Sequence, residues 1–183
     1  MILDFFAKES APFIPSEYLV KFATECWEYR GAAALRRQVF CEEQGIFLES
    51  DSDPIDDIAF PIVALSFLGV ASDEVVGTVR IHEDAPGVWW GSRLAVAPPF
   101  RRVGQIGAGL IRLAVSSACA RGCTSFFAHV QSQNLPLFQK MHWRSLEEVE
   151  ILGRPHHRMQ ADLSKYPPIS GTAFLSLPRK AAA

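Results

Sequence analysis

The stretch Val96-Ala-Pro-Pro-Phe-Arg101-Arg102-Val-Gly104-Gln-Ile-Gly107-Ala-Gly109-Leu-Ile111 decides how this chain is interpreted. It follows an apolar strand pattern that two prolines end, and apolar residues recur beyond it at helical spacing. The N–H groups that begin a helix have no partner within it and favour an anion, and glycines let a phosphate approach the backbone. Arg101 and Arg102 add donors that suit phosphate oxygens. The stretch therefore indicates either a phosphate-binding helix start or a purely structural turn.

Two common nucleotide-binding patterns do not fit this stretch. A dinucleotide-binding fingerprint has an acidic residue about 20 positions after its glycines to hold the ribose, and none follows here. A phosphate loop of the Walker type has a lysine after its last glycine, which is also absent.

The rest of the chain predicts one mixed α/β domain, with residues 18–165 as the domain, 1–17 as an extension and 166–183 as a tail or linker. We expect a turn at Asp73-Glu74 and a helix end at Gly122. This order predicts a largely antiparallel sheet with one parallel crossover. Strands are expected at residues 18–24, 61–68, 75–82, 87–97, 125–130, 146–152 and 156–163, and helices at 25–40, after the 104–109 turn, and at 135–142.

Composition excludes several classes of protein. Hydrophobic residues make up 49% of the 183 residues, which is too much for a disordered chain. The net charge of −2 argues against a basic nucleic-acid binder, and no apolar run approaches the roughly 20 residues of a membrane helix. The four cysteines lack metal-ligand spacing, so we expect free thiols and no metal. No signal-peptide pattern is present, which indicates a reducing, cytoplasmic setting.

The charges are segregated along the chain. Residues 42–84 hold 11 acids and a single base, Arg80, whereas residues 85–146 hold seven bases and no acid. Either the two segments neutralise each other in the fold, or the basic segment binds an anionic ligand and the acidic one a cationic ligand.

Several segments in chain order, spanning residues 18–163, resemble the GNAT superfamily of N-acyltransferases. Residues 75–81 (VVGTVRI) resemble its third strand, and residues 93–98 (RLAVAP) resemble its fourth strand and the proline that ends it. The arginine-glycine turn resembles the family's acyl-CoA pyrophosphate loop, Q/R-x-x-G-x-G/A, and residues 134–143 (NLPLFQKMHW) its closing N…FYxxxGF element. Residues 37–45 (RQVFCEEQG) resemble the VFxxEQG start of several GNAT subfamilies, nearest to a bacterial one of unassigned substrate.

The resemblance implies a GNAT-like α+β fold whose fourth and fifth strands splay apart around acetyl-CoA or another acyl-CoA. The pantetheine arm would pair with the fourth strand, and the pyrophosphate would lie on the amides of the turn. The residues so implied are Leu94, Ala95 and Val96 on the strand, Arg101, Arg102, Val103, Gly104, Gln105, Ile106, Gly107 and Ala108 at the turn, and Asn134 and Phe138 in the closing element.

Two departures from the family pattern bear on chemistry. Ile106 occupies the last glycine position of the loop and Gly107 follows it, as a one-residue insertion would produce. Phe138 stands where the family often has a tyrosine that protonates the leaving thiolate, and a phenyl ring has no proton to donate. Either another group or water supplies that proton, or the chain binds acyl-CoA without catalysis.

Acylation of an amine needs a base, and residues 87–97 carry no carboxylate that could serve as one. Glu43 and His129 are our candidate catalytic residues, and a local structural role stays open for each. Glu83 and Asp84 are weaker candidates. Trp89 and Trp90 point to opposite faces of a strand, so one belongs to the core and the other could wall the acceptor pocket. His156-His157 are expected on the surface.

The leading hypothesis is direct acyl transfer from acyl-CoA to the amine of a small acceptor. The acidic residues 42–57 would lie beside the acceptor and favour a cationic one. The alternative is a non-catalytic acyl-CoA-binding or regulatory GNAT module of a larger protein or complex, and a relative of acyl-homoserine-lactone synthases is a third reading. We expect no nucleic-acid or membrane partner, and edge strands in the last hairpin could pair two copies as a homodimer.

Overall fold

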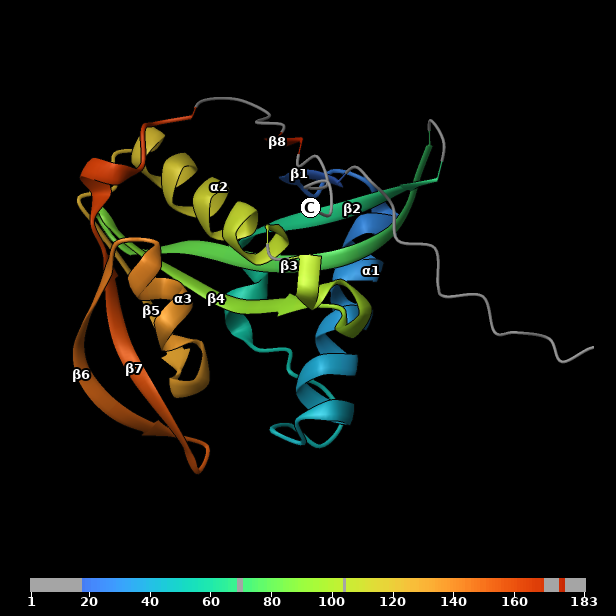
Figure 1. Cartoon of the computed structure of the whole chain (residues 1–183), viewed down its shortest axis with the longest axis horizontal. Coiled ribbons are helices and arrows are strands. Elements are labelled where there is room, and N and C mark those ends of the chain that lie inside the picture. Colours follow the sequence, from blue (N-terminus) through green and yellow to red (C-terminus); the bar gives the residue numbers. More distant parts are fainter. Residues whose placement is uncertain (1–17, 69–70, 104, 170–174, 177–183) are drawn as a thin grey trace, which may run out of the picture.

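The computed structural model describes residues 18–68, 71–103, 105–169 and 175–176. Within this part of the chain, eight strands form one sheet in the order β6-β7-β5-β4-β3-β2-β1-β8 (Figure 1). The strands are β1 (Tyr18–Phe22), β2 (Phe60–Leu68), β3 (Ala71–Ala85), β4 (Val88–Val96), β5 (Ser125–Gln131), β6 (Trp143–Ile151), β7 (Arg154–Ala161) and β8 (Leu175–Ser176). The helices are α1 (Cys26–Arg36), α2 (Ile106–Ala120) and α3 (Leu135–Lys140), with a π-helix η1 (Arg37–Glu43) and short 3-10 turns η2 (Pro54–Asp57), η3 (Pro98–Val103), η4 (Ser132–Asn134) and η5 (Leu163–Lys165).

All neighbouring strands pair antiparallel except β4 and β5, which are parallel. Their parallel pairing runs only from Val88–Ser125 to Gly91–Ala128. Beyond Gly91 the two strands separate, although β4 continues to Val96 and β5 to Gln131. The expected mixed fold, its single parallel crossover and its splayed strands are therefore confirmed.

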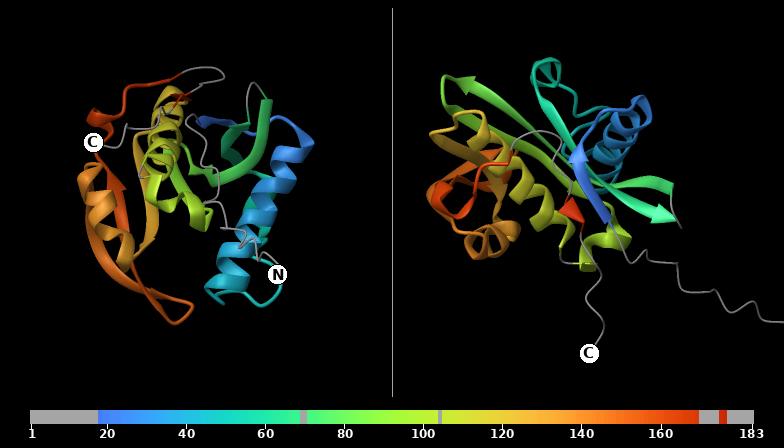
Figure 2. Two further views of the ribbon diagram at one scale, coloured as in Figure 1. Left: turned by 45° about the vertical axis from the view of Figure 1, so that its right-hand side comes forward. Right: turned by 90° about the horizontal axis from the view of Figure 1, so that it is seen from above.

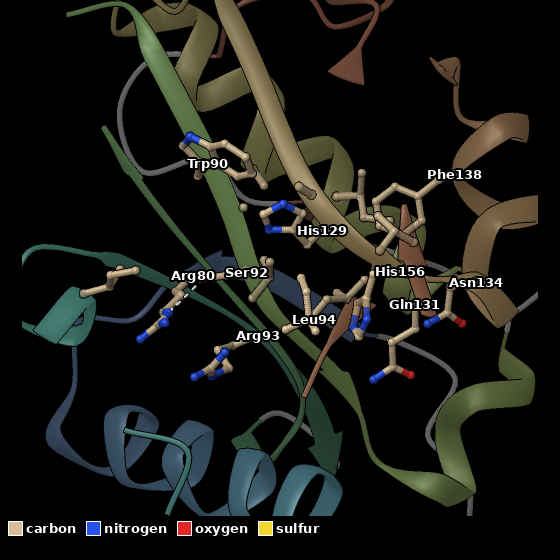
Figure 3. Close-up of a pocket in the computed structure, with 18 of the residues that line it drawn as sticks. Arg80, Trp90, Ser92, Arg93, Leu94, His129, Gln131, Asn134, Phe138 and His156 are labelled. Atoms are coloured by element: carbon tan, nitrogen blue, oxygen red, sulfur yellow. Dashed lines mark hydrogen bonds between the residues drawn. The ribbon is translucent and has the colours of Figure 1, made fainter. Parts of the chain in front are cut away.

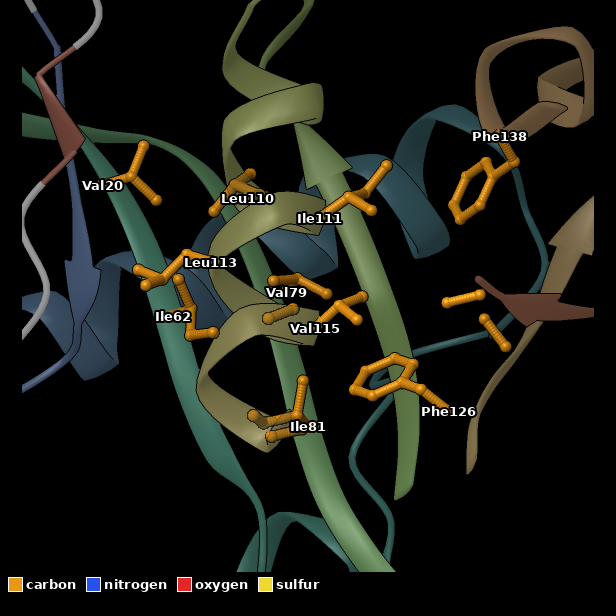
Figure 4. Close-up of a cluster of buried hydrophobic side chains, with 14 of the residues drawn as sticks. Val20, Ile62, Val79, Ile81, Leu110, Ile111, Leu113, Val115, Phe126 and Phe138 are labelled. Atoms are coloured by element: carbon orange, nitrogen blue, oxygen red, sulfur yellow. The ribbon is translucent and has the colours of Figure 1, made fainter. Parts of the chain in front are cut away.

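Helices cover both faces of the sheet (Figure 2). The helix α2 is apolar nearly all round, and with α3 it packs on one face against side chains such as Ile62, Val79 and Phe126 (Figure 4). On the other face α1 and η1 pack through Ala32, Leu35 and other small clusters. Gly77 lets α2 lie close to the sheet, because a Cβ there would stand 2.9 Å from the Ile106 and Leu110 side chains.

The first helix is fixed at its start by one buried carboxylate. Glu28 accepts hydrogen bonds from the backbone N–H groups of Thr24 (2.7 Å) and Glu25 (3.1 Å), and it forms an ion pair with Lys21 of β1. These bonds satisfy N–H groups that the helix itself cannot. The expected helix over residues 25–40 is confirmed, but its last part is a π-helix that runs to Glu43.

Two regions differ in detail from the sequence-based expectation. The turn expected at Asp73-Glu74 is wrong, because β3 already begins at Ala71, which pairs with Leu68. Register shifts on either side of Leu65 let the β2–β3 ladder continue past this acidic pair. At the C-terminus, Tyr166 is buried in the core and β8 pairs with β1, so part of residues 166–183 packs on the domain.

Candidate active site

A cavity of about 530 Å³ lies where β4 and β5 separate (Figure 3). Ile111 of α2, Phe126 of β5 and Phe138 of α3 line it on one face of the sheet. Phe40 of η1 and Trp90 of β4 line it on the other. The cavity therefore reaches both faces, so two molecules could meet inside it from opposite sides.

The free edge of β4 offers backbone groups to a ligand. After Gly91 no described strand lies alongside β4 on the β5 side, so backbone groups there can pair with an extended amide-containing chain. Leu94 lines the cavity at this edge. Ala95 instead packs against η1, and the carbonyl of Val96 accepts a hydrogen bond from the Arg101 Nε (2.9 Å).

The start of α2 follows directly from this edge. Gln105 precedes the helix, and the first intrahelical bond runs from the Gly109 N–H to its carbonyl (2.7 Å). The amides of Ile106, Gly107 and Ala108 are thus the free N–H groups of a helix N-terminus. The Ile106 side chain itself is buried in the core. Gly104 and the side chains of Arg102 and Val103 lie outside the described residues.

Asn134 and Phe138 lie at the α3 end of the cavity and line it. Phe138 is buried and packs edge-on against Trp143, with ring centroids 5.1 Å apart. Its environment is apolar.

A bulge distorts β4 at the point where the strands separate. Arg93 has a φ of 56°, and the pairing with β3 shifts register between Ser92 and Ala95. Left-handed backbone costs a non-glycine residue on the order of 1–2 kcal/mol. Strain of this kind collects at functional sites, where the surrounding structure holds it in place.

A closed ring of ion pairs, the Arg–Asp ring, holds this bulge. Three arginines from different elements alternate with three aspartates of the loop before β2, and each side chain binds two of the other kind. The distances around the ring are Arg36–Asp51 2.7 Å, Asp51–Arg93 2.9 Å, Arg93–Asp53 3.0 Å, Asp53–Arg80 2.7 Å, Arg80–Asp56 2.6 Å and Asp56–Arg36 2.6 Å.

The Arg–Asp ring is electrically balanced. It lowers the pKa of Asp53 chiefly through the hydrogen bond from Arg80, and that of Asp56 through hydrogen bonds from Arg36 and Arg80 that outweigh burial. Arg93 comes from the basic segment of the sequence, so the two oppositely charged segments do neutralise each other in part. Asp84, by contrast, lines the cavity and forms no ion pair with any described residue.

Two histidines line the cavity beside Trp90. The His129 ring lies 5.0 Å from the Trp90 ring; the residue is exposed, but partial desolvation against the cavity wall, and then the nearby charges of His156 and Arg158, lower its pKa. His82 is buried, and burial followed by the charge of Arg80 lowers its pKa. Both imidazoles are therefore neutral near pH 7 and can accept a proton.

Glu43 lies at the surface end of η1, outside the lining of the cavity. Both of its oxygens accept hydrogen bonds from Arg101, at 2.6 Å each. These bonds lower the pKa of Glu43 and raise that of Arg101. The two residues, which we predicted from the sequence to act separately, Glu43 in catalysis and Arg101 in cofactor binding, therefore form an ion pair.

Of the residues singled out from the sequence, the structure brings His129, Leu94, Asn134 and Phe138 together around one cavity. Trp89 belongs to the core and Trp90 to the cavity wall, which agrees with the prediction that the two tryptophans point to opposite faces of the strand. The expectation that His156 and His157 lie on the surface is wrong: His157 is buried and shares a hydrogen bond with Ser145 (3.0 Å), and His156, which is partly buried, lies on the cavity wall. His82 also lies on this wall but was not among the residues predicted from the sequence, although its two-residue spacing from Arg80 and Asp84 places all three on one face of a strand.

The sheet thus opens between two parallel strands, beside a helix N-terminus and a cavity with both apolar and charged walls. The sequence profile described as "Acetyltransferase (GNAT) family" matches residues 32–143. The chain belongs to the GNAT acetyltransferase family, which makes it an enzyme of the N-acetyltransferase type.

Individual relatives agree with this assignment. The chain is 30% identical over 139 residues to "Uncharacterized N-acetyltransferase YjcF" of Bacillus subtilis, covering 74% of this chain and 93% of the relative. A provisionally assigned N-acetyltransferase from Lactobacillus plantarum superposes with a TM-score of 0.70 at 24% identity, over 80% of this chain and 98% of the other. Escherichia coli ElaA superposes with a TM-score of 0.65 at 19% identity, over 79% and 98%. No described helix is long and apolar enough to cross a membrane.

Proposed function

We propose that the protein transfers an acyl group, most simply acetyl from acetyl-CoA, directly to the amine of a small acceptor. The observation that carries this proposal is the cavity at the β4–β5 separation, which reaches both faces of the sheet. Donor and acceptor can then meet in one ternary complex, and no covalent enzyme intermediate is needed. The four cysteines are free thiols, which supports a reducing, cytoplasmic setting.

The residues present fit an acyl-CoA. The β5-facing backbone of β4 near Leu94 to Val96 can pair with the amides of a pantetheine arm, and the amides that begin α2 can hold a pyrophosphate. Arg101 lies next to that helix start and adds a guanidinium. When bound, the thioester supplies the acyl group that the amine receives.

His129 is our choice for the general base. It lies on the cavity wall where the strands part, and its lowered pKa keeps the imidazole unprotonated at neutral pH. From there it can take the proton from the acceptor amine, directly or through a water. Glu43 is less suited to this task because Arg101 holds both of its oxygens.

The acceptor would enter from the face that carries Trp90 and His82. Asp84 supplies an acidic group on that wall, which favours an amine that is cationic before it loses its proton. The Arg–Asp ring is already neutral, so the acidic loop attracts a cation less strongly than its sequence suggests.

One observation favours the alternative function. By the sequence resemblance Phe138 corresponds to the family's acid tyrosine, and its buried phenyl ring has no proton to give, as expected for an acyl-CoA-binding module without catalysis. In an active enzyme, water at the cavity end near Asn134 would protonate the departing thiolate.

Thermal-shift titration with acetyl-CoA, CoA and ATP, followed by an amine screen for thiol release, tests the proposal. A ligand at 100 times its Kd adds about 2.7 kcal/mol to the free energy of unfolding. We expect shifts with both CoA species, none with ATP, and thiol release with at least one small amine. Shifts without thiol release would favour the binding module, and no shift with CoA would refute both.

A further inference from the structure

The last residues of η1 span the gap between β4 and β5. Glu43 binds Arg101 of η3, which follows β4. The side-chain oxygen of Gln44 accepts a hydrogen bond from the Gln131 amide at the end of β5 (2.9 Å). The backbone carbonyl of Gln44 accepts a second hydrogen bond, from Arg154 of β7. We call Glu43 and Gln44, with these three contacts, the clasp. It joins both sides of the opening through which a ligand would reach the free edge of β4.

The clasp also touches both halves of the proposed site. On one side it holds Arg101, the only arginine with a described side chain at the start of α2. On the other side, Gln44 and Phe40, one turn earlier in η1, line the cavity wall that faces the acceptor. Breaking the Glu43–Arg101 pair can therefore change the position of Gln44 and Phe40 on the acceptor side of the cavity.

In the Glu43–Arg101 pair, the carboxylate occupies the two terminal nitrogens of the guanidinium, which are the donors best suited to a phosphate. Both terminal nitrogens of Arg101 donate to the carboxylate, and its Nε donates to the Val96 carbonyl. The two side chains are 40% and 38% exposed, so solvent screens the pair and a multiply charged anion can displace the carboxylate. A pyrophosphate bound there would also be repelled by the displaced carboxylate beside it.

We propose that Glu43 is a positioning residue that competes with the pyrophosphate of the cofactor for Arg101, and that it holds η1 against η3 until the cofactor binds. This inference rests on the function proposed above. Glu43 therefore weakens cofactor binding, and its contact with Arg101 fixes the end of η1 only while the cofactor is absent. Release of Arg101 from Glu43 on cofactor binding links the two halves of the site through η1.

The first test compares Glu43→Gln with the wild-type protein in calorimetric titrations with CoA and with pantetheine, which lacks the pyrophosphate. Removing one carboxylate charge a few ångströms from a phosphate at the surface should tighten CoA binding by roughly three- to tenfold. The Kd of pantetheine should stay unchanged. The gain for CoA should shrink at 0.5 M salt, because screening weakens the repulsion.

Glu42→Gln is the matched control. Glu42 is the neighbouring acid on η1, and it pairs loosely with exposed Arg37 at 3.4 Å, away from the cavity. This variant should leave the Kd of CoA within twofold. In steady-state assays, Glu43→Gln should lower the KM of acetyl-CoA while Glu42→Gln does not, and neither should change the KM of the acceptor at saturating acetyl-CoA, because the cofactor has then already displaced Glu43 from Arg101.

The outcomes separate the inference from the function on which it rests. Tighter CoA binding by Glu43→Gln, with pantetheine unaffected, supports the clasp. Unchanged or weaker CoA binding by a folded Glu43→Gln protein, with a wild-type protein that binds CoA, overturns the clasp and leaves the proposed function standing. A wild-type protein that binds neither CoA nor acetyl-CoA overturns the proposed function and the clasp with it.

Discussion

We expect the Arg–Asp ring to stabilise the folded protein, and Arg80 allows the size of this contribution to be tested. Its side chain is 3% exposed, binds Asp53 and Asp56, and donates from Nε to the Ser92 Oγ at 2.9 Å. Arg80→Met keeps the apolar stem and removes the charge. Losing one member of a buried ion pair costs about 3–5 kcal/mol. The two aspartates are about 30% exposed and each keeps a second arginine, so we expect a smaller loss, about 2–3 kcal/mol.

The loss of stability caused by Arg80→Met should depend on pH, in a direction set by the pKa shifts of the aspartates. The pKa values of Asp53 and Asp56 are lowered in the fold, so the stability that they contribute is present above the unfolded pKa near 4 and is lost as pH falls. In Arg80→Met both pKa values move back up. The difference in unfolding free energy between the two proteins should therefore be largest at pH 7 and shrink progressively as the pH falls below the unfolded pKa near 4.

Urea denaturation followed by circular dichroism measures this difference at each pH. Arg37→Met is the control, because Arg37 and its partner Glu42 are 66% and 62% exposed and 3.4 Å apart. That substitution should change stability by less than about 0.5 kcal/mol. A loss for Arg80→Met no larger than the control, or one equally large at pH 3 and pH 7, would refute the idea that the ring stabilises the fold through charge.

Two further predictions concern the base and the packing of α2. His129→Gln should lower kcat by about 10²–10³-fold with little change in the Kd of acetyl-CoA. The wild-type rate should rise with pH through a pKa below 6.5, and the variant should lack that limb; an unchanged pH profile would contradict the role of His129. Gly77→Ala should cost about 1–3 kcal/mol in thermal unfolding, because the new Cβ would stand 2.9 Å from Ile106. Gly107→Ala, whose Cβ would have its nearest neighbour at 4.0 Å, should not destabilise the fold, and equal losses would contradict the packing argument.

The order of strands and helices was accessible from the sequence because each element carries its own period. The alternating residues of β4 and β5 and the apolar spacing of α2 set these elements without knowledge of their neighbours. The turn before β3 was misplaced because Asp73 and Glu74 are typical turn residues, whereas pairing with β2 decides where the strand begins. That pairing is a tertiary effect, which local propensity does not contain.

The candidate site was only partly accessible. His129 could be placed on a strand, but its neighbours come from distant segments: Trp90 by parallel pairing and His156 by the β5–β7 register. The Arg–Asp ring joins side chains that lie up to 57 positions apart, from Arg36 to Arg93. The charge pattern of the sequence therefore indicated that the two segments neutralise each other, but it could not identify which residues pair. The pairing of Glu43 with Arg101 has the same origin.

The contact between Trp90 and His129 has an optical consequence. A protonated imidazole quenches the fluorescence of an adjacent indole because it accepts charge from the excited ring, whereas a neutral imidazole does so weakly. With ring centroids 5.0 Å apart, the emission of Trp90 should follow the charge on His129. The other three tryptophans, Trp27, Trp89 and Trp143, contribute a background that replacing Trp90 with phenylalanine would isolate. The protein thus has an intrinsic fluorophore beside its proposed base, which can report the titration of that base without a label.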